Sequence, residues 1–241
     1  MQLARLASWV HKWLAFLVGV QVVFWVVSGL FFTLFPIEQI RSEHLVRAPQ
    51  AVLAIDGAAL GNLSLIHDAQ NRAPTKVTLE QRANGPAAVA EFADGDPILF
   101  DAATLRQLSP LDRDAALRIA RGHVTLTDAP VSAVLVSEHS AEYRGPLPAW
   151  RVQFAEGGLR VYVAANTGAV TARRSDLWRL YDTLWALHIM DWRDHENFHH
   201  PLIIAFTVIT LLSVIAGIVL IPYRIRFRRA RPRKVLAEPS A

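Results

Sequence analysis

Two long segments without a charged residue dominate this sequence of 241 residues. One runs from Trp13 to Ile37 and the other from Pro201 to Tyr223. Each exceeds the roughly 20 apolar residues that a helix needs to cross about 30 Å of hydrocarbon. Hydrophobic residues make up 52% of the chain, which is high for an ordinary soluble protein, and these segments supply the excess. The sequence therefore predicts two transmembrane helices.

The first apolar segment lies near the N-terminus, where a secretory signal peptide would also lie. Its apolar run is longer than the roughly 7–15 residues of a signal-peptide core, and no small-x-small cleavage motif follows at 32–36. We therefore expect this segment to be an uncleaved membrane anchor.

A basic run directly follows the second apolar segment. Such a cluster stays on the cytoplasmic side of a membrane. Two crossings would then place both termini in the cytoplasm and residues 38–200 on the other side. For a chain in the inner membrane of a bacterium, that side is the periplasm. Without these seven charges the formal net charge of +4 becomes −3, so the basicity indicates topology more than nucleic-acid binding. The basic residues are Arg224, Arg226, Arg228, Arg229, Arg231, Arg233 and Lys234.

The segment between the two apolar stretches contains alternating helix and strand patterns. It has no cysteine, which excludes disulfides and thiolate metal sites. A first cycle has a helix pattern at 51–69, strand patterns at 75–82 and 87–93, and a further strand after the turn at Asp94-Gly95. A second cycle has a helix pattern at 112–123, followed by strands of which two are joined by a hairpin turn at Gly157-Gly158. The two cycles suggest an internal duplication.

The second cycle carries a family resemblance. DAALRIA, PAWRVQF and LRVYVAANTGAV together resemble the PepSY domain, in which a helix packs on a small antiparallel sheet. Ala164 stands where that family has an aspartate. HKWLAFLVGVQVVFWVVSGL and LWRLYDTLWALHIMDW resemble the first helix of PepSY-associated transmembrane proteins and the segment that leads into their last helix.

The resemblance implies an α+β fold in which two transmembrane helices flank a periplasmic domain of two PepSY-like helix-plus-antiparallel-sheet units. The expected divisions are a cytoplasmic N-terminus (1–12), a first transmembrane helix (13–37), two PepSY-like units (38–108 and 109–174), an interfacial helix with a juxtamembrane turn (175–200), a second transmembrane helix (201–223) and a basic cytoplasmic tail (224–241).

The stretch His195-Glu196-Asn197-Phe198-His199 has the H-E-x-x-H spacing of zinc proteases. A protease needs this motif on a packed helix with a third ligand. Pro201 disfavours a helical conformation of the preceding residue, so we expect a juxtamembrane turn or the last turn of a helix. His195 and His199 are therefore candidates for weak or adventitious metal binding.

A helix is predicted from Asp176 to Trp192, with Trp178, Tyr181, Trp185, His188 and Trp192 on one face. The simplest interpretation is an interfacial strut within which His188 is hydrogen-bonded. The alternative makes His188 an axial ligand of a b-type haem, because an imidazole on a helix at the membrane boundary is the usual ligand and aromatic walls suit a porphyrin. In the resembled family, larger PepSY-associated proteins with four helices include siderophore-iron reductases that carry haem. The partner ligand of His188 would be His44, His195, His199 or His200, since His11 lies about 30 Å away across the membrane and would need a second copy of the chain.

Small and polar residues in the apolar segments predict helix pairing. Ser213 and Gly217 form a small-x-x-x-small pair, Ser28 and Gly29 allow close approach, and Gln21 offers a polar contact. These residues fit a homodimer as well as pairing of the two helices within one chain, and we expect the second.

Three functions remain open from the sequence. The first is non-enzymatic: the outer domain binds or regulates another membrane or periplasmic protein at the bilayer surface, without nucleic acid. The second is a haem b-binding component of an iron or siderophore reduction or electron-transfer system, with His188, His11, His199 and His200 as candidate ligands. The third is zinc-dependent hydrolysis through His195, Glu196 and His199.

Overall fold

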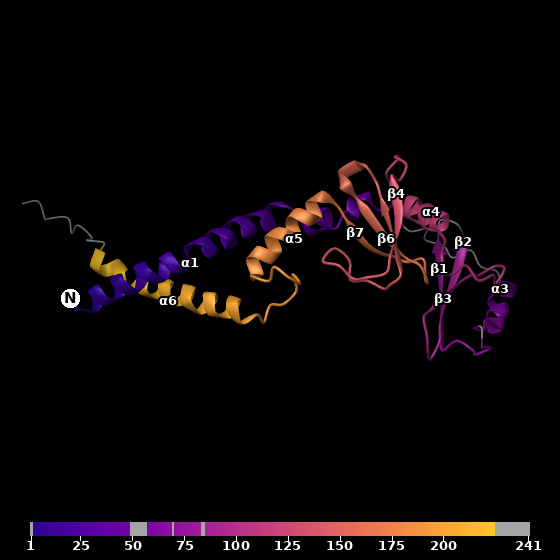
Figure 1. Ribbon diagram of the computed structural model, residues 1–241, viewed down its shortest axis with the longest axis horizontal. Helices are drawn as coiled ribbons and strands as arrows, with labels where there is room; N and C mark the ends of the chain where they lie inside the picture. The colour runs from indigo at the N-terminus through magenta and orange to yellow at the C-terminus, as the bar shows by residue number, and fades with distance from the viewer. Residues whose placement is uncertain (1, 49–56, 69, 83–84, 225–241) are drawn as a thin grey trace, which may run out of the picture.

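The computed structural model describes residues 2–48, 57–68, 70–82 and 85–224 (Figure 1). The molecule is elongated, with long helices at one end and the sheets at the other. The basic run on which the predicted orientation rests lies outside the described residues, apart from Arg224.

Two apolar helices lie side by side at one end of the molecule. Helix α1 (Gln2–Leu34) is about 50 Å long and packs against α6 (Pro201–Arg224). Both are long and apolar enough to cross a membrane, so the prediction of two such helices is confirmed. Helix α1 begins eleven residues before the uncharged segment and ends just before Phe35-Pro36, because a residue that precedes proline disfavours helix.

Short elements lead from α1 into the outer domain. Helix α2 (Ile37–Ile40) and the 3-10 helix η1 (Glu43–Leu45) are followed by α3 (Gly57–Asn62) and the 3-10 helix η2 (Leu63–Leu65). The helix predicted over 51–69 is therefore shorter within the described residues, and 51–56 lie outside them. Gly57, Gly61 and Asn62 are poor helix formers, which accounts for the short element.

The first sheet is three-stranded and antiparallel. It consists of β1 (Lys76–Arg82), β2 (Gly85–Glu91) and β3 (Ile98–Asp101) in sequence order. Val77 lies opposite Ala90, and Val89 lies opposite Leu99. All three strands were expected from the sequence pattern.

The second sheet follows α4 (Arg113–His123), whose first turn is capped by the Asp112 carboxylate accepting from the Ala115 N–H at 2.7 Å. Its strands pair antiparallel in the order β4 (Ser132–Val136), β5 (Ala149–Gln153), β6 (Arg160–Ala164) and β7 (Val170–Arg174). The predicted hairpin joins β5 to β6 through the 3-10 turn η3 (Glu156–Gly158). Gly157 and Gly158 have φ of +57° and +59°, which glycine adopts without strain.

One hydrophobic core joins the two sheets. Ala116 and Ala120 of α4 lie in the same buried cluster as Val161 of β6, and Val89 and Leu99 of the first sheet belong to that cluster as well. The opposite face of the first sheet packs on a smaller cluster around Ile66. The two sequence cycles therefore share a core rather than folding around separate ones.

A long loop (137–148) covers the outer face of the second sheet. The Tyr143 ring stacks on Tyr162 of β6, with ring centroids 4.3 Å apart. Its hydroxyl lies 2.8 Å from both the Pro146 carbonyl oxygen and Thr171 Oγ1. This loop is therefore fixed to the sheet by a buried, hydrogen-bonded aromatic side chain.

Helix α5 (Asp176–Ile189) follows β7 and returns along the C-terminal half of α1. Its first turn is capped by Ser175, whose hydroxyl accepts from the Trp178 N–H. It ends at Ile189 because Met190 takes a left-handed conformation with φ of +58°. The expectation that this helix continues to Trp192 is therefore wrong, and Trp192 lies in the following loop.

Candidate functional site

The candidate residues of the sequence lie mainly on α5, which packs against α1, and in the loop 191–200 that follows α5. The last turn of α5 presents carbonyl groups that have no partner within the helix. Gln21 Nε2 donates to the Leu187 carbonyl at 2.9 Å, and Trp25 Nε1 donates to the His188 carbonyl at 2.7 Å. These contacts explain why the uncharged part of α1 carries a buried glutamine, and they fix the end of α5 against α1.

The His188 imidazole belongs to the same seam. Its Nδ1 lies 2.7 Å from Ser28 Oγ, and that hydroxyl lies 2.6 Å from the Phe24 carbonyl oxygen, to which it donates. Nδ1 therefore carries the proton and donates to Ser28, which leaves the lone pair of neutral histidine on Nε2. His188 is thus hydrogen-bonded as the simpler interpretation expects, but to α1 rather than within its own helix.

Three aromatic rings surround the His188 imidazole. The rings of Phe32, Trp185 and Trp25 lie with their centroids 5.7, 6.3 and 6.4 Å from the imidazole. The prospective partner ligands have other contacts: His195 Nδ1 lies 2.6 Å from Asp182 Oδ2, and His200 Nδ1 accepts from the Leu202 N–H at 3.3 Å. Haem binding at His188 stays a prediction that this packing does not favour.

His11 lies in the contact between α1 and α6. Its Nδ1 lies 2.8 Å from the Ser213 carbonyl oxygen, and a Cβ added to Gly217 would come within 3.1 Å of its ring. Gly217 therefore makes room for the imidazole, and the small residues of α6 serve pairing within the chain. Along α1, His11 is about 26 Å from Ser28, the partner of His188.

The H-E-x-x-H residues form a turn, as the sequence predicts, rather than a helix. His195 has a φ of +59°, and its imidazole pairs with Asp182 of α5. Glu196 forms an ion pair with Arg144, and His199 is exposed. Among the described residues, no group of three or more histidine, aspartate and glutamate side chains is placed to hold a metal ion.

Asp191 organises this turn. Its Oδ1 accepts from the N–H groups of Arg193 and Asp194, and its Oδ2 accepts from those of Glu196 and Asn197, at 3.0–3.3 Å. These backbone hydrogen bonds, the one from Asn197 foremost, lower the pKa of Asp191 from 3.8 to about 2. The buried carboxylate replaces the helical hydrogen bonds that the turn lacks.

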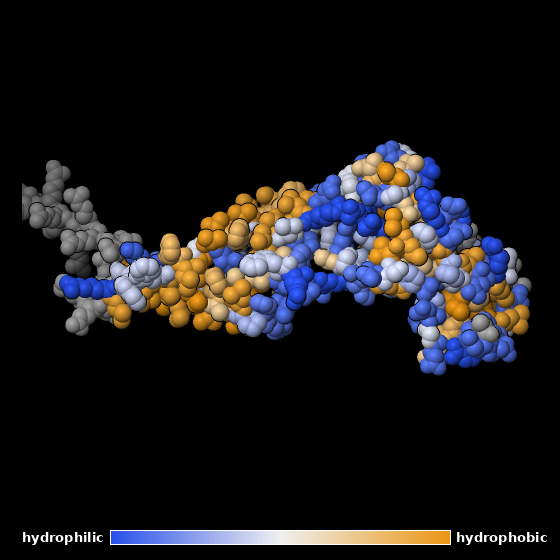
Figure 2. Space-filling view, viewed as in Figure 1, coloured by the Kyte–Doolittle hydropathy of each residue, from blue (hydrophilic) through white to orange (hydrophobic). Residues whose placement is uncertain are grey.

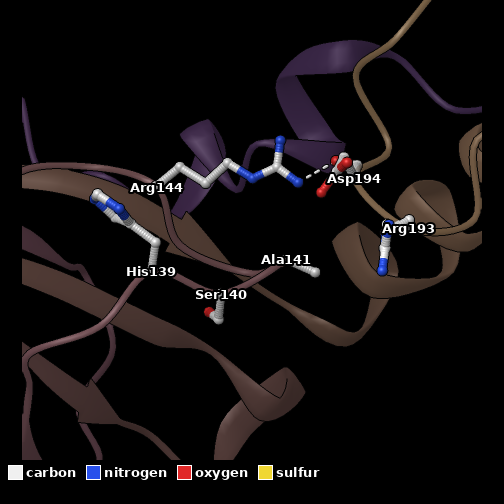
Figure 3. A pocket seen from close by; sticks show the side chains of 6 residues that line it. All are labelled: His139, Ser140, Ala141, Arg144, Arg193 and Asp194. Carbon is white, nitrogen blue, oxygen red and sulfur yellow. Dashed lines mark hydrogen bonds between the residues drawn. The ribbon is translucent and has the colours of Figure 1, made fainter.

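The same turn is tied to the outer domain. Arg144, in the loop that covers the second sheet, pairs with Glu196 and donates to the Asp194 carbonyl. Figure 3 shows Arg144 reaching across to Asp194 above a shallow hollow of about 360 Å³. The hollow is lined by His139, Ser140, Ala141, Arg144, Arg193 and Asp194.

Glu142 links the loop to α5 and to the sheet. Its carboxylate accepts from Arg160 of β6 at 2.5 Å and from Arg179 of α5 at 3.1 Å. Its carbonyl accepts from Arg174 Nε at 2.9 Å, and the Arg174 guanidinium lies 4.1 Å from the centroid of the Trp178 ring. These residues could not be predicted from the sequence, because their partners lie far along the chain. Only Asp191, directly after a helix end, carried a local signal, since an aspartate at such a position often binds backbone N–H groups.

The comparisons with known proteins add no relative. No protein-family model, no curated protein and no solved structure matches this chain.

Proposed function

We propose that this protein is a non-catalytic accessory module of a bacterial inner membrane, with α1 and α6 crossing the bilayer and both termini in the cytoplasm. Its PepSY-like periplasmic domain binds an extended segment of another protein by adding it as a strand to the second sheet. The observation that carries this proposal is the free, uncharged edge strand β4.

Strand β4 has the sequence SAVLV and lies at the edge of its sheet. Val134 and Leu135 are each 46% exposed, and Val131 just before the strand is 64% exposed. Within the part of the chain that the structure describes, no strand pairs with the outer side of β4. Soluble domains normally protect such an edge with charge, proline or a covering segment.

The other edge strands, β1, β3 and β7, are protected by charged side chains or by a covering segment. Strand β1 carries Lys76, Glu80 and Arg82. Strand β3 is followed by a segment that pairs with it, with the Leu108 N–H donating to the Leu99 carbonyl at 2.8 Å. Strand β7 ends in two arginines, one of which, Arg173, donates to the Arg41 carbonyl. The contrast with β4 supports a binding role for that edge.

An extended, apolar segment is the partner that suits β4. Main-chain hydrogen bonds would supply affinity, and successive side chains would contact opposite faces of the extended sheet. Val134 and Leu135 offer apolar contacts on both faces. The basic run after α6 supports the cytoplasmic placement of the termini, and hence the periplasmic placement of this edge.

Site-specific cross-linking in the host membrane tests the proposal. A photoreactive residue at Leu135 should give one defined adduct, and Val134→Lys in the same chain should abolish it, because a charge on the edge opposes strand addition. Thr78→Lys on the edge strand β1 is the matched control and should leave the adduct unchanged. An adduct that survives Val134→Lys would rule out binding at β4.

A further inference from the structure

Arginine side chains gather on the outer face of the second sheet, the face that the loop 137–148 covers. Arg160 and Arg174 lie opposite each other on β6 and β7, and Glu142 of the loop accepts hydrogen bonds from both. Arg151 of β5 lies on the same face, because it is two residues before the position that pairs with Arg160. Arg151 is half-buried, and its guanidinium forms no hydrogen bond or ion pair with another described residue.

Arg151 lies next to the free edge of the sheet. It pairs directly with Val134 of β4, and the side chains of two paired residues project from the same face. No other charged residue occurs in β4 or β5. The charge of Arg151 is therefore the one that these two strands offer to a segment added at the edge.

The guanidinium of Arg151 can extend to such a segment. A strand added to β4 would lie two strand spacings from β5, which is about 10 Å. Arginine lays its apolar stem along apolar surface and keeps its charged end in a polar environment, and the short side chain of Val134 offers that surface. A guanidinium pairs best with a carboxylate, to which it can donate two parallel hydrogen bonds.

The opposite face of β4, on the side of α4, is apolar. Leu135 lies there opposite Trp150 of β5, and Ala133 packs against the shared core. Figure 2 shows hydrophobic surface beside hydrophilic surface at the second sheet, where Figure 1 labels β4. Because successive side chains of a strand point to opposite faces, the neighbours of an acidic residue on the outer face would meet this apolar face.

We infer that the segment bound at β4 carries an acidic residue beside Val134, with an apolar residue before and after it, and that Arg151 selects this segment by pairing with the acid. The inference rests on the strand addition proposed above, and it names the class of segment that β4 accepts. Arg151 is the residue that determines specificity, while the main chain of β4 supplies the hydrogen bonds common to any added strand.

Two labelled peptides test the inference on the detergent-purified full chain. Both are extended peptides of alternating valine and threonine in which the central residue, between two valines, is glutamate in one and lysine in the other. Fluorescence anisotropy should show that wild type binds the glutamate peptide roughly fivefold more tightly, because opposite charges on neighbouring strands attract and like charges repel. Arg151→Glu should reverse this order, and Arg151→Gln should bind the two peptides equally.

The matched control is Arg118→Glu. Arg118 is exposed on the side of α4 away from the buried Ala116 and Ala120, so this variant should keep the preference of wild type. Equal binding of both peptides by wild type, or a preference for glutamate that persists in Arg151→Glu, would overturn the role of Arg151 and leave strand addition standing. Binding of neither peptide by wild type would contradict strand addition as well.

Discussion

At the scale of single residues, the turn between α5 and α6 depends on one carboxylate. Asp191 is 7% exposed and accepts four backbone hydrogen bonds. Of the residues for which the sequence suggested metal chemistry, His195 pairs with Asp182 and Glu196 pairs with Arg144. The H-E-x-x-H spacing alone could not predict these ion pairs. The Asp182 carboxylate lies 13 residues from His195 in sequence, and the Arg144 guanidinium lies 52 residues from Glu196.

Replacing this carboxylate should open the turn. Asp191→Asn removes the charge that four N–H groups share, at an expected cost of about 1–3 kcal/mol in the local opening free energy. Hydrogen exchange of the amides at 193–197 should accelerate accordingly, and Asp194→Asn, an exposed acid of the same turn, should have little effect. In wild type, the turn should be ordered above pH 3.8 and become disordered as the pH falls towards about 2, because the folded pKa lies below the unfolded one. Unchanged protection in Asp191→Asn would refute this role.

At the scale of elements, local pattern predicted most of the structure. The capped helix α4, the alternating strand β1 and the glycine hairpin between β5 and β6 follow from nearby residues. The end of α5 did not, because it is set by the left-handed Met190 and by Asp191. The shared core of the two sheets was also missed, since the apolar run along β2 shows that both of its faces are apolar but not what covers each face.

A contact between α4 and β7 should make the stability of the domain that contains the two sheets depend on pH. His123 ends α4, and its Nε2 lies 3.1 Å from the Arg173 guanidinium of β7. Burial, and then the charge of Arg173, lower the pKa of His123 below its usual 6.5. As the pH falls through 6.5, the unfolded chain takes up a proton that the folded chain refuses, so stability should decrease.

Thermal unfolding checks this expectation. Wild type should unfold at a lower temperature at pH 5.5 than at pH 7.5. The difference should shrink in His123→Gln, whose amide oxygen still accepts from Arg173, and should persist in His67→Gln, an exposed histidine of the same domain. The idea fails if both variants retain the full difference.

At the scale of the whole molecule, the domain that contains the two sheets is fixed to the long helices through several contacts rather than one linker. Glu142 and Arg144, from one loop of the domain, contact α5 and the turn before α6. Gln21, Trp25 and Ser28 hold α5 against α1. A segment bound at β4 would therefore be held at a set orientation relative to α1 and α6.

The proposed topology puts the sheets and the basic C-terminal run on opposite sides of one membrane. Labelling of single cysteines with a membrane-impermeant maleimide, in spheroplasts of a bacterial host, tests it most directly. Asp96→Cys, exposed in the outer domain, should be labelled in intact spheroplasts, and Ser240→Cys only after the membrane is permeabilised. Labelling of both positions before permeabilisation, or of Ser240→Cys alone, would contradict the account.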